Sequence, residues 1–344
     1  MLAVQKTARG PGVMLVDVPE PASPGPAEVI VEVTAAGICG SDVHIYEWRG
    51  SSYDALEKSL PVTLGHEFAG RIAALGRDVI SLKLGDRVTA VPSIGCGGCE
   101  SCLAGKFNEC GAQQGIGLSR AGCFARFVCL PARVCLPLPA NVNDQLGALV
   151  EPLTIALNAV VTGQVGQGHR VLVLGAGPIA QGMAIFARAA GAKEVVVTGM
   201  NDKSRFGVFR QLRIDRLIDF ADHDASEQLA SARANGFDVV LEATGVPTTI
   251  QQGLQNLRHA GVLVTAGIHP APAAFDVTQL VRRSLQIRGA YGAPLSIWRD
   301  VIAALQRKPA DFSPIISHRL PFAQALQGFE LAHKREASKV MLLF

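Results

Sequence analysis

The chain has 344 residues, of which 49% are hydrophobic and 18% charged, and its net charge at pH 7 is +3. This length suits two domains of ordinary size, and the apolar fraction excludes an intrinsically disordered chain. The weak positive charge, with both signs interspersed, argues against nucleic acid or an anionic membrane surface as a partner.

The first 150 residues are predicted to form a β-rich domain. Short runs rich in β-branched residues, separated by Gly and Pro, favour strands. We expect strands at residues 29–34, 69–75, 87–91 and 124–130. Many short strands of this kind predict a partial barrel.

Three segments of this domain carry side chains that bind metals. Cys39 follows the first strand, His66 and Glu67 follow Gly65, and Glu151 lies where the strand-rich part ends. One thiolate, one imidazole and one or two carboxylates could form a catalytic zinc site with an open position. Neighbouring residues of a regular strand point to opposite faces, so His66 and Glu67 could share a metal only if the backbone bends at Gly65. Each residue could equally be buried packing, a core histidine or a helix-start carboxylate, and spacing alone does not assemble the site.

The strongest local signal is Cys96-Gly-Gly-Cys99-Glu-Ser-Cys102, followed by Cys110. Four thiols this close in sequence can surround one tetrahedral Zn²⁺ and leave no position for a substrate. A bacterial iron–sulfur run has a shorter last gap and a Pro after its last cysteine, whereas Gly111 follows Cys110 here. Disulfides are disfavoured because the chain has no secretory signal. The spacing therefore predicts a structural zinc.

From about residue 151 the pattern changes to strands that alternate with helices. This alternation indicates a parallel sheet with crossover helices. We expect strands at 171–174, 195–198, 216–219, 238–242 and 261–266, then a helix around 297–305 and a last strand at 339–344. The segment after 289 is predicted to return to the first domain. The predicted domains are therefore 1–150 completed by 290–344, and 151–289.

A glycine motif follows the strand at 171–174. It reads Gly175-Ala-Gly177-Pro178-Ile179-Ala180 and opens a helical run to about residue 191. The first Gly makes the turn, the second lets the backbone approach a pyrophosphate, and the helix N-terminus faces the phosphates. Between a strand and a helix, this pattern predicts a dinucleotide site.

The end of the next strand bears on the choice between NAD and NADP. NAD sites usually have an acidic residue there, and this chain has Gly199. Without that carboxylate nothing repels a 2′-phosphate, and the next residues offer donors and positive charge: Asn201, Lys203, Ser204 and Arg205. We therefore favour NADP(H). The alternative is that Asp202 binds the ribose diol and the basic residues are a solvated helix start.

Together these motifs resemble the zinc-dependent medium-chain alcohol dehydrogenases, in the branch that contains sorbitol (polyol) and L-threonine dehydrogenases. The resemblance covers nearly the whole chain. It rests on Gly37-Ile-Cys39-Gly-Ser-Asp42, Gly65-His66-Glu67, Gly85-Asp86-Arg87-Val88, the four cysteines, Glu151-Pro152-Leu153 and the motif at Gly175. It implies an α/β fold class, with a GroES-like catalytic domain and a Rossmann coenzyme domain.

The resemblance also implies roles for individual residues. Cys39, His66 and Glu67 would bind the catalytic zinc, with Glu151 as a further ligand or a partner of the zinc-bound water. Ser41 and His44 match a hydroxyl and a histidine that relay the alcohol proton to solvent. Cofactor contacts are expected at Ile179, Gly199, Arg205, Ala266, Gly267, Ile268, Ala290 and Tyr291.

The implied activity is reversible hydride transfer between a secondary alcohol (a polyol, diol or amino alcohol) and NADP or NAD. Threonine dehydrogenases have a histidine where we find Ser93, and Tyr-Gly-Arg where this chain has Tyr291-Gly-Ala293. Two other interpretations are a zinc-independent NADP(H) carbonyl or quinone reductase of the same superfamily, and a non-catalytic nucleotide-binding redox protein.

The expected partner is a small alcohol or ketone, and the resemblance suggests a homo-oligomer, either a tetramer or a dimer. The N-terminus has no apolar run of signal-peptide length, and no segment approaches the ~20 apolar residues of a membrane helix. We therefore expect a soluble, cytoplasmic protein.

Overall fold

The computed structural model describes residues 1–48, 54–214 and 216–344. The chain forms two compact units, Met1–Glu151 with Ala293–Phe344, and Pro152–Gly292. The second unit therefore ends three residues later than the domain boundary at 289 expected from the sequence. Two hydrogen bonds explain the difference: Ala290 N donates to Thr265 O (2.9 Å), and Asn158 Nδ2 donates to Gly292 O (2.7 Å).

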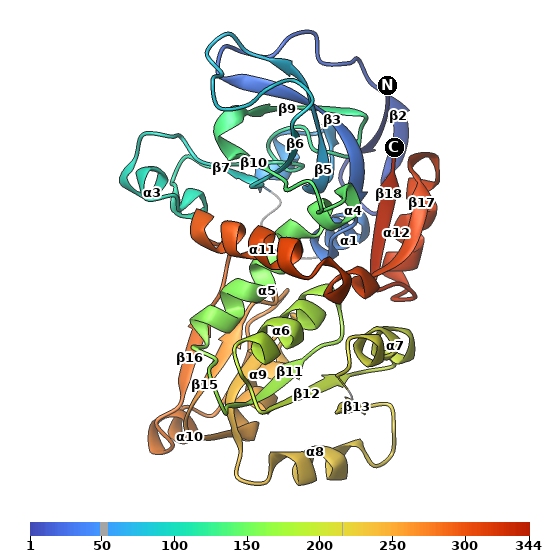
Figure 1. Ribbon diagram of the computed structural model, residues 1–344. Helices are drawn as coiled ribbons and strands as arrows, with labels where there is room; N and C mark the ends of the chain where they lie inside the picture. The colour runs from blue at the N-terminus through green and yellow to red at the C-terminus, as the bar shows by residue number, and fades with distance from the viewer. Residues whose placement is uncertain (49–53, 215) are drawn as a thin grey trace. The chain divides into compact units, whose positions relative to one another are not determined.

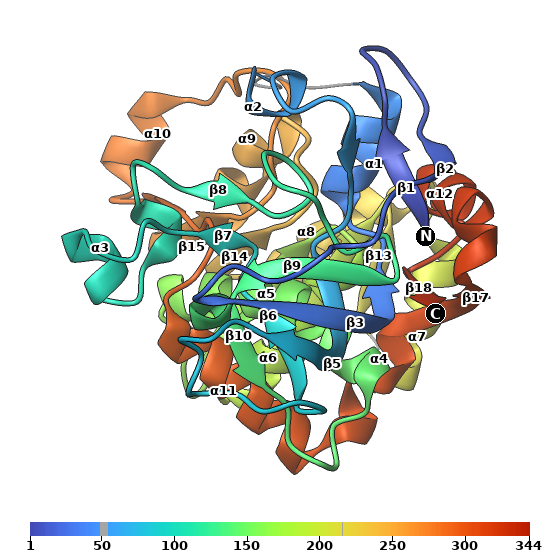
Figure 2. The same cartoon turned by 90° about the horizontal axis from the view of Figure 1, so that it is seen from above.

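The first unit is organised around a mixed seven-stranded sheet (Figure 2). Its strands are ordered β10 (Cys135–Pro137), β6 (Arg87–Ala90), β5 (Glu67–Leu75), β3 (Glu28–Gly37), β18 (Lys339–Leu343) and β17 (Ile316–Pro321), and β9 (Phe127–Pro131) also pairs with β3. A three-stranded sheet adds β2 (Met14–Asp17), β1 (Leu2–Lys6) and β4 (Val62–Thr63), and β7 (Ser93–Ile94) pairs with β8 (Gln114–Gly115). The four strands predicted in this region are present, although the last begins at Phe127 rather than Phe124.

Helices and short 3₁₀ turns lie in the connections between these strands. They are α1 (Gly40–Glu47), α2 (Asp54–Glu57), α3 (Glu100–Leu103), η1 (Phe107–Glu109), η2 (Ala132–Val134), α4 (Asp144–Ala148), α11 (Leu295–Arg307), η3 (Pro309–Asp311), η4 (Ser313–Ile315), η5 (Phe322–Gln324) and α12 (Ala325–His333). Figures 1 and 2 show the loop that contains α3 projecting from the side of the unit. The return of the C-terminal segment places β18 beside β3, with Met341 opposite Gly37.

The second unit is a six-stranded parallel sheet with helices between its strands (Figure 1). The order is β13 (Leu217–Asp219), β12 (Glu194–Gly199), β11 (Arg170–Leu174), β14 (Phe237–Glu242), β15 (Leu257–Thr265) and β16 (Gln286–Gly289). The helices are α5 (Val150–Thr162), which begins in the first unit, α6 (Pro178–Ala189), α7 (Lys203–Gln211), α8 (Ala225–Arg233), α9 (Thr248–Asn256) and α10 (Val277–Arg282). If the six strands are numbered along the chain, their order across the sheet is 3-2-1-4-5-6. Two halves of the sheet therefore meet beside β11, where dinucleotides bind in such sheets.

The five strands predicted for this unit are present because their central residues are apolar on both faces. Leu172, Leu174, Val240 and Leu263 are among those that are fully buried. β16 was not predicted because it is an edge strand whose residues are largely exposed. Across the described ranges, no helix has both the length and the apolar character to cross a bilayer.

Candidate active site

Two groups of metal-ligand side chains occur among the residues that the structure describes, and both lie in the first unit. The first contains the four cysteines 96, 99, 102 and 110, whose sulfur atoms all lie within 4.8 Å of one another. A tetrahedral zinc site with bonds of roughly 2.3 Å has sulfur–sulfur edges of about 3.8 Å. The donor set and its spacing therefore fit Zn²⁺, as predicted from the sequence.

The backbone of the projecting loop holds these thiols in place. Cys99 lies at the N-cap of α3, and Cys110 follows η1. Cys96 N donates to Cys110 Sγ (3.3 Å), and Arg133 Nη2 donates to Gly95 O (2.6 Å). Backbone N–H groups, first that of Gly98, lower the pKa of the Cys96 thiol to about 6. Such a thiol is readily present as the thiolate that a metal requires.

The second group contains Cys39, His66 and Glu67, with ligand atoms also within 4.8 Å of one another. The antiparallel register of β3 and β5 explains their meeting, because Gly37 at the end of β3 lies opposite Glu67 at the start of β5. Cys39 is two residues beyond Gly37, at the N-cap of α1. Sheet pairing thus brings together side chains from two distant segments.

Gly65 provides the bend that was expected beside this group. Its φ is +91°, and a Cβ at this position would lie 2.5 Å from the Phe124 ring. A residue with a side chain would be disfavoured by both its backbone and its packing. The bend allows the neighbouring side chains of His66 and Glu67 to point to one place, which a regular strand forbids.

Lys339 from β18 pairs with Glu67, a contact that the sequence did not predict. Its Nζ donates to both carboxylate oxygens (2.8 and 2.6 Å) and to Ile38 O (2.9 Å). The side chains are 3% and 0% exposed. Burial alone lowers the pKa of Lys339, but the charges of Glu67 and Cys39 outweigh burial and raise it. Glu67 is therefore paired with a buried cation through both of its carboxylate oxygens.

Asp42 orients the other two members. Its Oδ2 accepts from Cys39 N (2.9 Å), and its Oδ1 lies 3.7 Å from His66 Nδ1. Burial lowers the pKa of His66, but the Asp42 carboxylate and Cys39 raise it overall to well above its ordinary value. A carboxylate behind a histidine ring is the usual arrangement behind a metal-binding imidazole. The sequence contains a signal for this role, because an acidic residue three positions after an N-cap residue is typical of a capping box.

Glu151 lies near this group but outside the tight set. It is 7% exposed, and burial raises its pKa to about 7, against the opposing charge of His66. The site therefore concentrates one thiol and three carboxyl groups, those of Asp42, Glu67 and Glu151, around one imidazole and one ammonium. This excess of anionic ligands favours a bound cation, and the thiol and imidazole favour Zn²⁺ over Mg²⁺ or Ca²⁺.

Ser41 and His44 lie on α1, directly after Cys39. Ser41 Oγ is 3.5 Å from His66 Nε2, and the side chains of Ser41 and His44 are exposed. Residues three apart share a helix face, so Ser41 and His44 form a polar strip from the metal ligands toward solvent.

The glycine motif of the second unit has the geometry of a phosphate site. Gly175 follows β11 with a φ of +114°, and Gly177 is the N-cap of α6, with Pro178 at its first position. A Cβ on Gly177 would meet nothing within 4 Å, so the space before the helix N-terminus is open. Ile179 lies in the first turn. Unpaired N–H groups of a first turn face such a space and favour a pyrophosphate.

The segment after β12 is held by carboxylates. Asp219 accepts from Asn201 N (2.8 Å) and Asp202 N (3.2 Å). Asp202 is only 6% exposed; it accepts from Met200 N (3.1 Å) and pairs with Arg205 (3.2 Å). The exposed side chains at this strand end are those of Met200, Asn201, Lys203 and Ser204, of which the last three are polar or charged. Asp202 is thus largely committed within the fold, and so is Arg205.

The other expected cofactor residues follow β15 and β16. Ala266, Gly267 and Ile268 come directly after β15, and Ala290 and Tyr291 directly after β16. The carboxyl ends of parallel strands share one edge, so these residues lie along the same edge of the sheet as Gly175.

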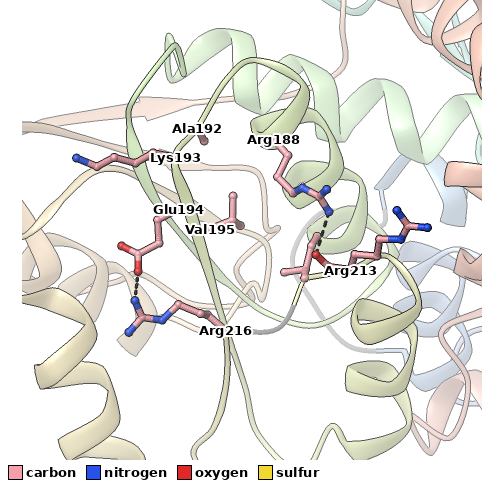
Figure 3. Close-up of a pocket in the computed structure, with 8 residues that line it drawn as sticks. Arg188, Ala192, Lys193, Glu194, Val195, Arg213 and Arg216 are labelled. Carbon is pink, nitrogen blue, oxygen red and sulfur yellow. Dashed lines mark hydrogen bonds and ion pairs between the residues drawn. The ribbon is translucent and has the colours of Figure 1, made fainter.

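A cavity of about 580 Å³ lies at the opposite edge (Figure 3). Lys193 and Glu194 line it at the amino end of β12, where Arg216 pairs with Glu194. Arg188 donates to the Arg213 carbonyl (3.1 Å). Because dinucleotides bind at carboxyl ends, this basic cavity is not the cofactor site.

The chain is similar to several known proteins. Two family models match the chain: the alcohol dehydrogenase GroES-like domain over residues 25–140, and the zinc-binding dehydrogenase over residues 178–307. L-threonine 3-dehydrogenase of Idiomarina loihiensis is 34% identical over 343 residues, which cover 99% of each chain. The solved structures that align with all of this chain include 2R,3R-butanediol dehydrogenase from Bacillus subtilis (25% identity, 99% of that chain, TM-score 0.88) and galactitol-1-phosphate dehydrogenase from Escherichia coli (26% identity, 100% of that chain, TM-score 0.87).

Proposed function

Since the chain belongs to the zinc-dependent medium-chain alcohol dehydrogenase family, we propose that Cys39, His66 and Glu67 hold its catalytic zinc. The family, the fold class and the NAD(P)-dependent alcohol dehydrogenase activity predicted from the sequence are confirmed by the comparisons. The observation that carries the proposal is the convergence of the three ligand atoms within 4.8 Å. The four cysteines hold a second, structural zinc in the proposed enzyme.

The reaction is reversible oxidation of a secondary alcohol to a ketone. Zn²⁺, when bound, supplies a Lewis acid for the alcohol oxygen, and NAD(P) accepts the hydride. Ser41 takes the alcohol proton at Oγ and passes its own to His44, which releases it to solvent. Asp42 keeps His66 and Cys39 oriented, and Lys339 balances the charge of Glu67. Glu151 serves as a further ligand or as a proton-holding group beside the open position.

The substrate is a small polyol, diol or amino alcohol. The named relatives act on L-threonine, butanediol and galactitol 1-phosphate, which all carry a second polar group near the alcohol. Ser93 and Ala293 replace the histidine and arginine expected in threonine dehydrogenases. These two replacements favour a neutral diol or polyol over L-threonine.

NADP(H) is the preferred cofactor in this proposal. Gly199 leaves the end of β12 without a carboxylate, and Asp202 is buried against Met200 N and Arg205. Asn201, Lys203 and Ser204 remain exposed beside it and suit a 2′-phosphate. Gly175, Gly177, Pro178 and Ile179 receive the pyrophosphate. The loops after β15 and β16 contact the remainder of the cofactor through Ala266, Gly267, Ile268, Ala290 and Tyr291.

We also propose a cytoplasmic homo-oligomer, either a dimer or a tetramer. The edge strand β16 and the nearby helix α10 expose Ile287, Val277 and Val281. Exposed apolar side chains beside an unpaired strand edge suit contact with a second copy. None of the eight cysteines, all of which the structure describes, forms a disulfide, which suits a reducing compartment.

A panel of alcohols assayed in parallel with NAD and NADP tests the function directly. L-threonine, 2,3-butanediol and hexitols represent the three substrate types, and zinc content is measured on the same preparation. We expect turnover of a diol or polyol, a preference for NADP, and two zinc ions per chain. One zinc ion per chain in fully active protein would refute the proposed catalytic zinc.

A further inference from the structure

A fully buried carboxylate stands at the carboxyl end of β14. Glu242 is 0% exposed, although it lies beside the edge where the cofactor is expected. Its Oε1 accepts from Thr244 N (2.6 Å), Gly245 N (3.0 Å) and Thr249 Oγ1 (3.1 Å). This one oxygen therefore fixes the whole loop between β14 and α9.

The second oxygen holds the loop after β15. Glu242 Oε2 accepts from Thr265 Oγ1 (3.1 Å) and from His269 Nε2 (3.2 Å). The Glu242 carbonyl also accepts from Ala266 N (2.9 Å). Residues 266–268 are thus held at one end by the strand and at the other end by His269.

The two loops pack directly against each other. A Cβ on Gly267 would lie 2.3 Å from Gly245 N and 2.7 Å from Glu242 Oε2. Only glycine permits this approach. The two loops are therefore in direct backbone contact.

His269 is arranged in a way that stability alone does not favour. Its side chain is 16% exposed, and its Nε2 faces Glu242. Its Nδ1 is buried and has no hydrogen-bond partner among the residues that the structure describes. A buried unpaired polar atom costs about 1–3 kcal/mol. The unpaired nitrogen therefore points to a functional reason for an imidazole at this place.

The position of these loops in the sheet supplies that reason. β14 and β15 lie on one side of β11, and β12 lies on the other. In such sheets each half receives one half of the dinucleotide, and the adenosine half lies over the strand that follows the glycine motif. We propose that Glu242 and His269 are positioning residues that shape residues 266–268 for the nicotinamide half, an inference that rests on the proposed cofactor site.

The test compares the whole cofactor with its adenosine half. His269→Ala is titrated with NADPH and NADH, and with adenosine 2′,5′-bisphosphate and AMP as adenosine-half probes. We expect the Kd of the preferred dinucleotide to rise about tenfold, as loss of a buried hydrogen bond predicts, with the Kd of its adenosine half unchanged. His259→Ala is the matched control, because His259 is exposed on β15 of the same unit.

Two more variants separate positioning from stability. His269→Gln, which keeps a donor for Glu242, is expected to restore most of the dinucleotide affinity. Glu242→Gln is expected to weaken dinucleotide binding in the same selective way, measured on protein whose melting transition shows that it is folded. Equal loss for both ligands, or no loss in His269→Ala, overturns the inference. Absence of dinucleotide binding by the unaltered protein would instead refute the proposed cofactor site.

Discussion

The two groups of metal-ligand side chains in the first unit differ both in their ligand atoms and in how the chain assembles them. Cysteines 96–110 come from one short projecting loop, and local backbone bonds such as that from Cys96 N to Cys110 Sγ hold them. Cys39, His66 and Glu67 come from two segments that the register of β3 and β5 brings together. The first cluster is thus a property of a loop, and the second is a property of the folded sheet.

This difference has a consequence for chemistry. The loop cluster uses four equivalent thiols and closes around its ion, which suits a structural role. The sheet cluster mixes thiol, imidazole and carboxylate, and each is held by a group outside the set, namely Asp42 or Lys339. A slip of one residue between β3 and β5 would turn Glu67 to the other face of the sheet. The reactive site therefore depends on the global fold, whereas the closed one does not.

Cys39→Ala gives the largest expected effect and separates the two clusters. Loss of one ligand from a three-ligand site should lower turnover by at least about 10⁴-fold, because several kcal/mol of Lewis-acid stabilisation are lost. Elemental analysis should find one zinc per chain instead of two, and NADPH titration should give an unchanged Kd. Cys129→Ala is the control, since Cys129 is a half-buried thiol of the same unit outside both clusters. Normal rates in Cys39→Ala would refute a catalytic metal at this site.

Cys99→Ala removes the other zinc and should act on stability. A closed site contributes its binding energy to folding, so we expect a loss of about 4 kcal/mol or more in the free energy of unfolding. The measurement is denaturant unfolding, with zinc content determined beforehand. Protein that remains folded should keep the catalytic zinc. The contrary outcome is a fall in turnover as large as that in Cys39→Ala while the catalytic zinc is still fully bound. That result would show that the four-cysteine site affects catalysis as well as stability.

The same contrast explains what could be predicted from the sequence. The four-cysteine site and the motif at Gly175 were predicted because all of their residues lie close together along the chain. The second cluster could not be assembled from spacing and entered through the family resemblance. Its partner Lys339 lies 272 residues from Glu67, and only the pairing of β18 with β3 brings it there.

The fold was predicted more completely than the site. Strands that are buried on both faces, such as β11 and β14, can be predicted from the sequence because they form continuous apolar runs. β16 lacks that signal because it is an exposed edge. The sequence signal for Glu242 is weak, a single acid at the end of an apolar strand. The donors to its carboxylate lie in the loop after β14, in the first turn of α9, at the end of β15 and in the loop after β15.

Lys339→Met tests whether the sheet cluster depends on charge balance. In zinc-free protein, removing the ammonium leaves Glu67 as a buried carboxylate without a cation, and breaking such a pair costs about 3 kcal/mol or more. Denaturant unfolding should show this loss, and Lys339→Arg, which keeps the charge, should recover part of it. The double variant Lys339→Met with Glu67→Gln should be more stable than Lys339→Met alone.

Lys334→Met is the matched control for this pair. Lys334, at the C-cap of α12, contacts Glu330 at 3.7 Å, but the side chains are 58% and 45% exposed. Exposed pairs one helical turn apart contribute only about 0.3–0.5 kcal/mol. Equal losses in Lys334→Met and Lys339→Met would show that burial does not set the importance of the Glu67 pair.

His44→Asn gives the smallest expected effect and separates metal binding from proton transfer within the sheet cluster. Because His44 is exposed, water can replace it in part, and we expect turnover to fall only about tenfold at neutral pH. Zinc should stay at two per chain, since His44 is not among the converging ligands. Small imidazole-like buffers should restore the rate if the residue carries a proton. If zinc content falls and the rate does not, His44 belongs to the metal site and not to the proton path to solvent.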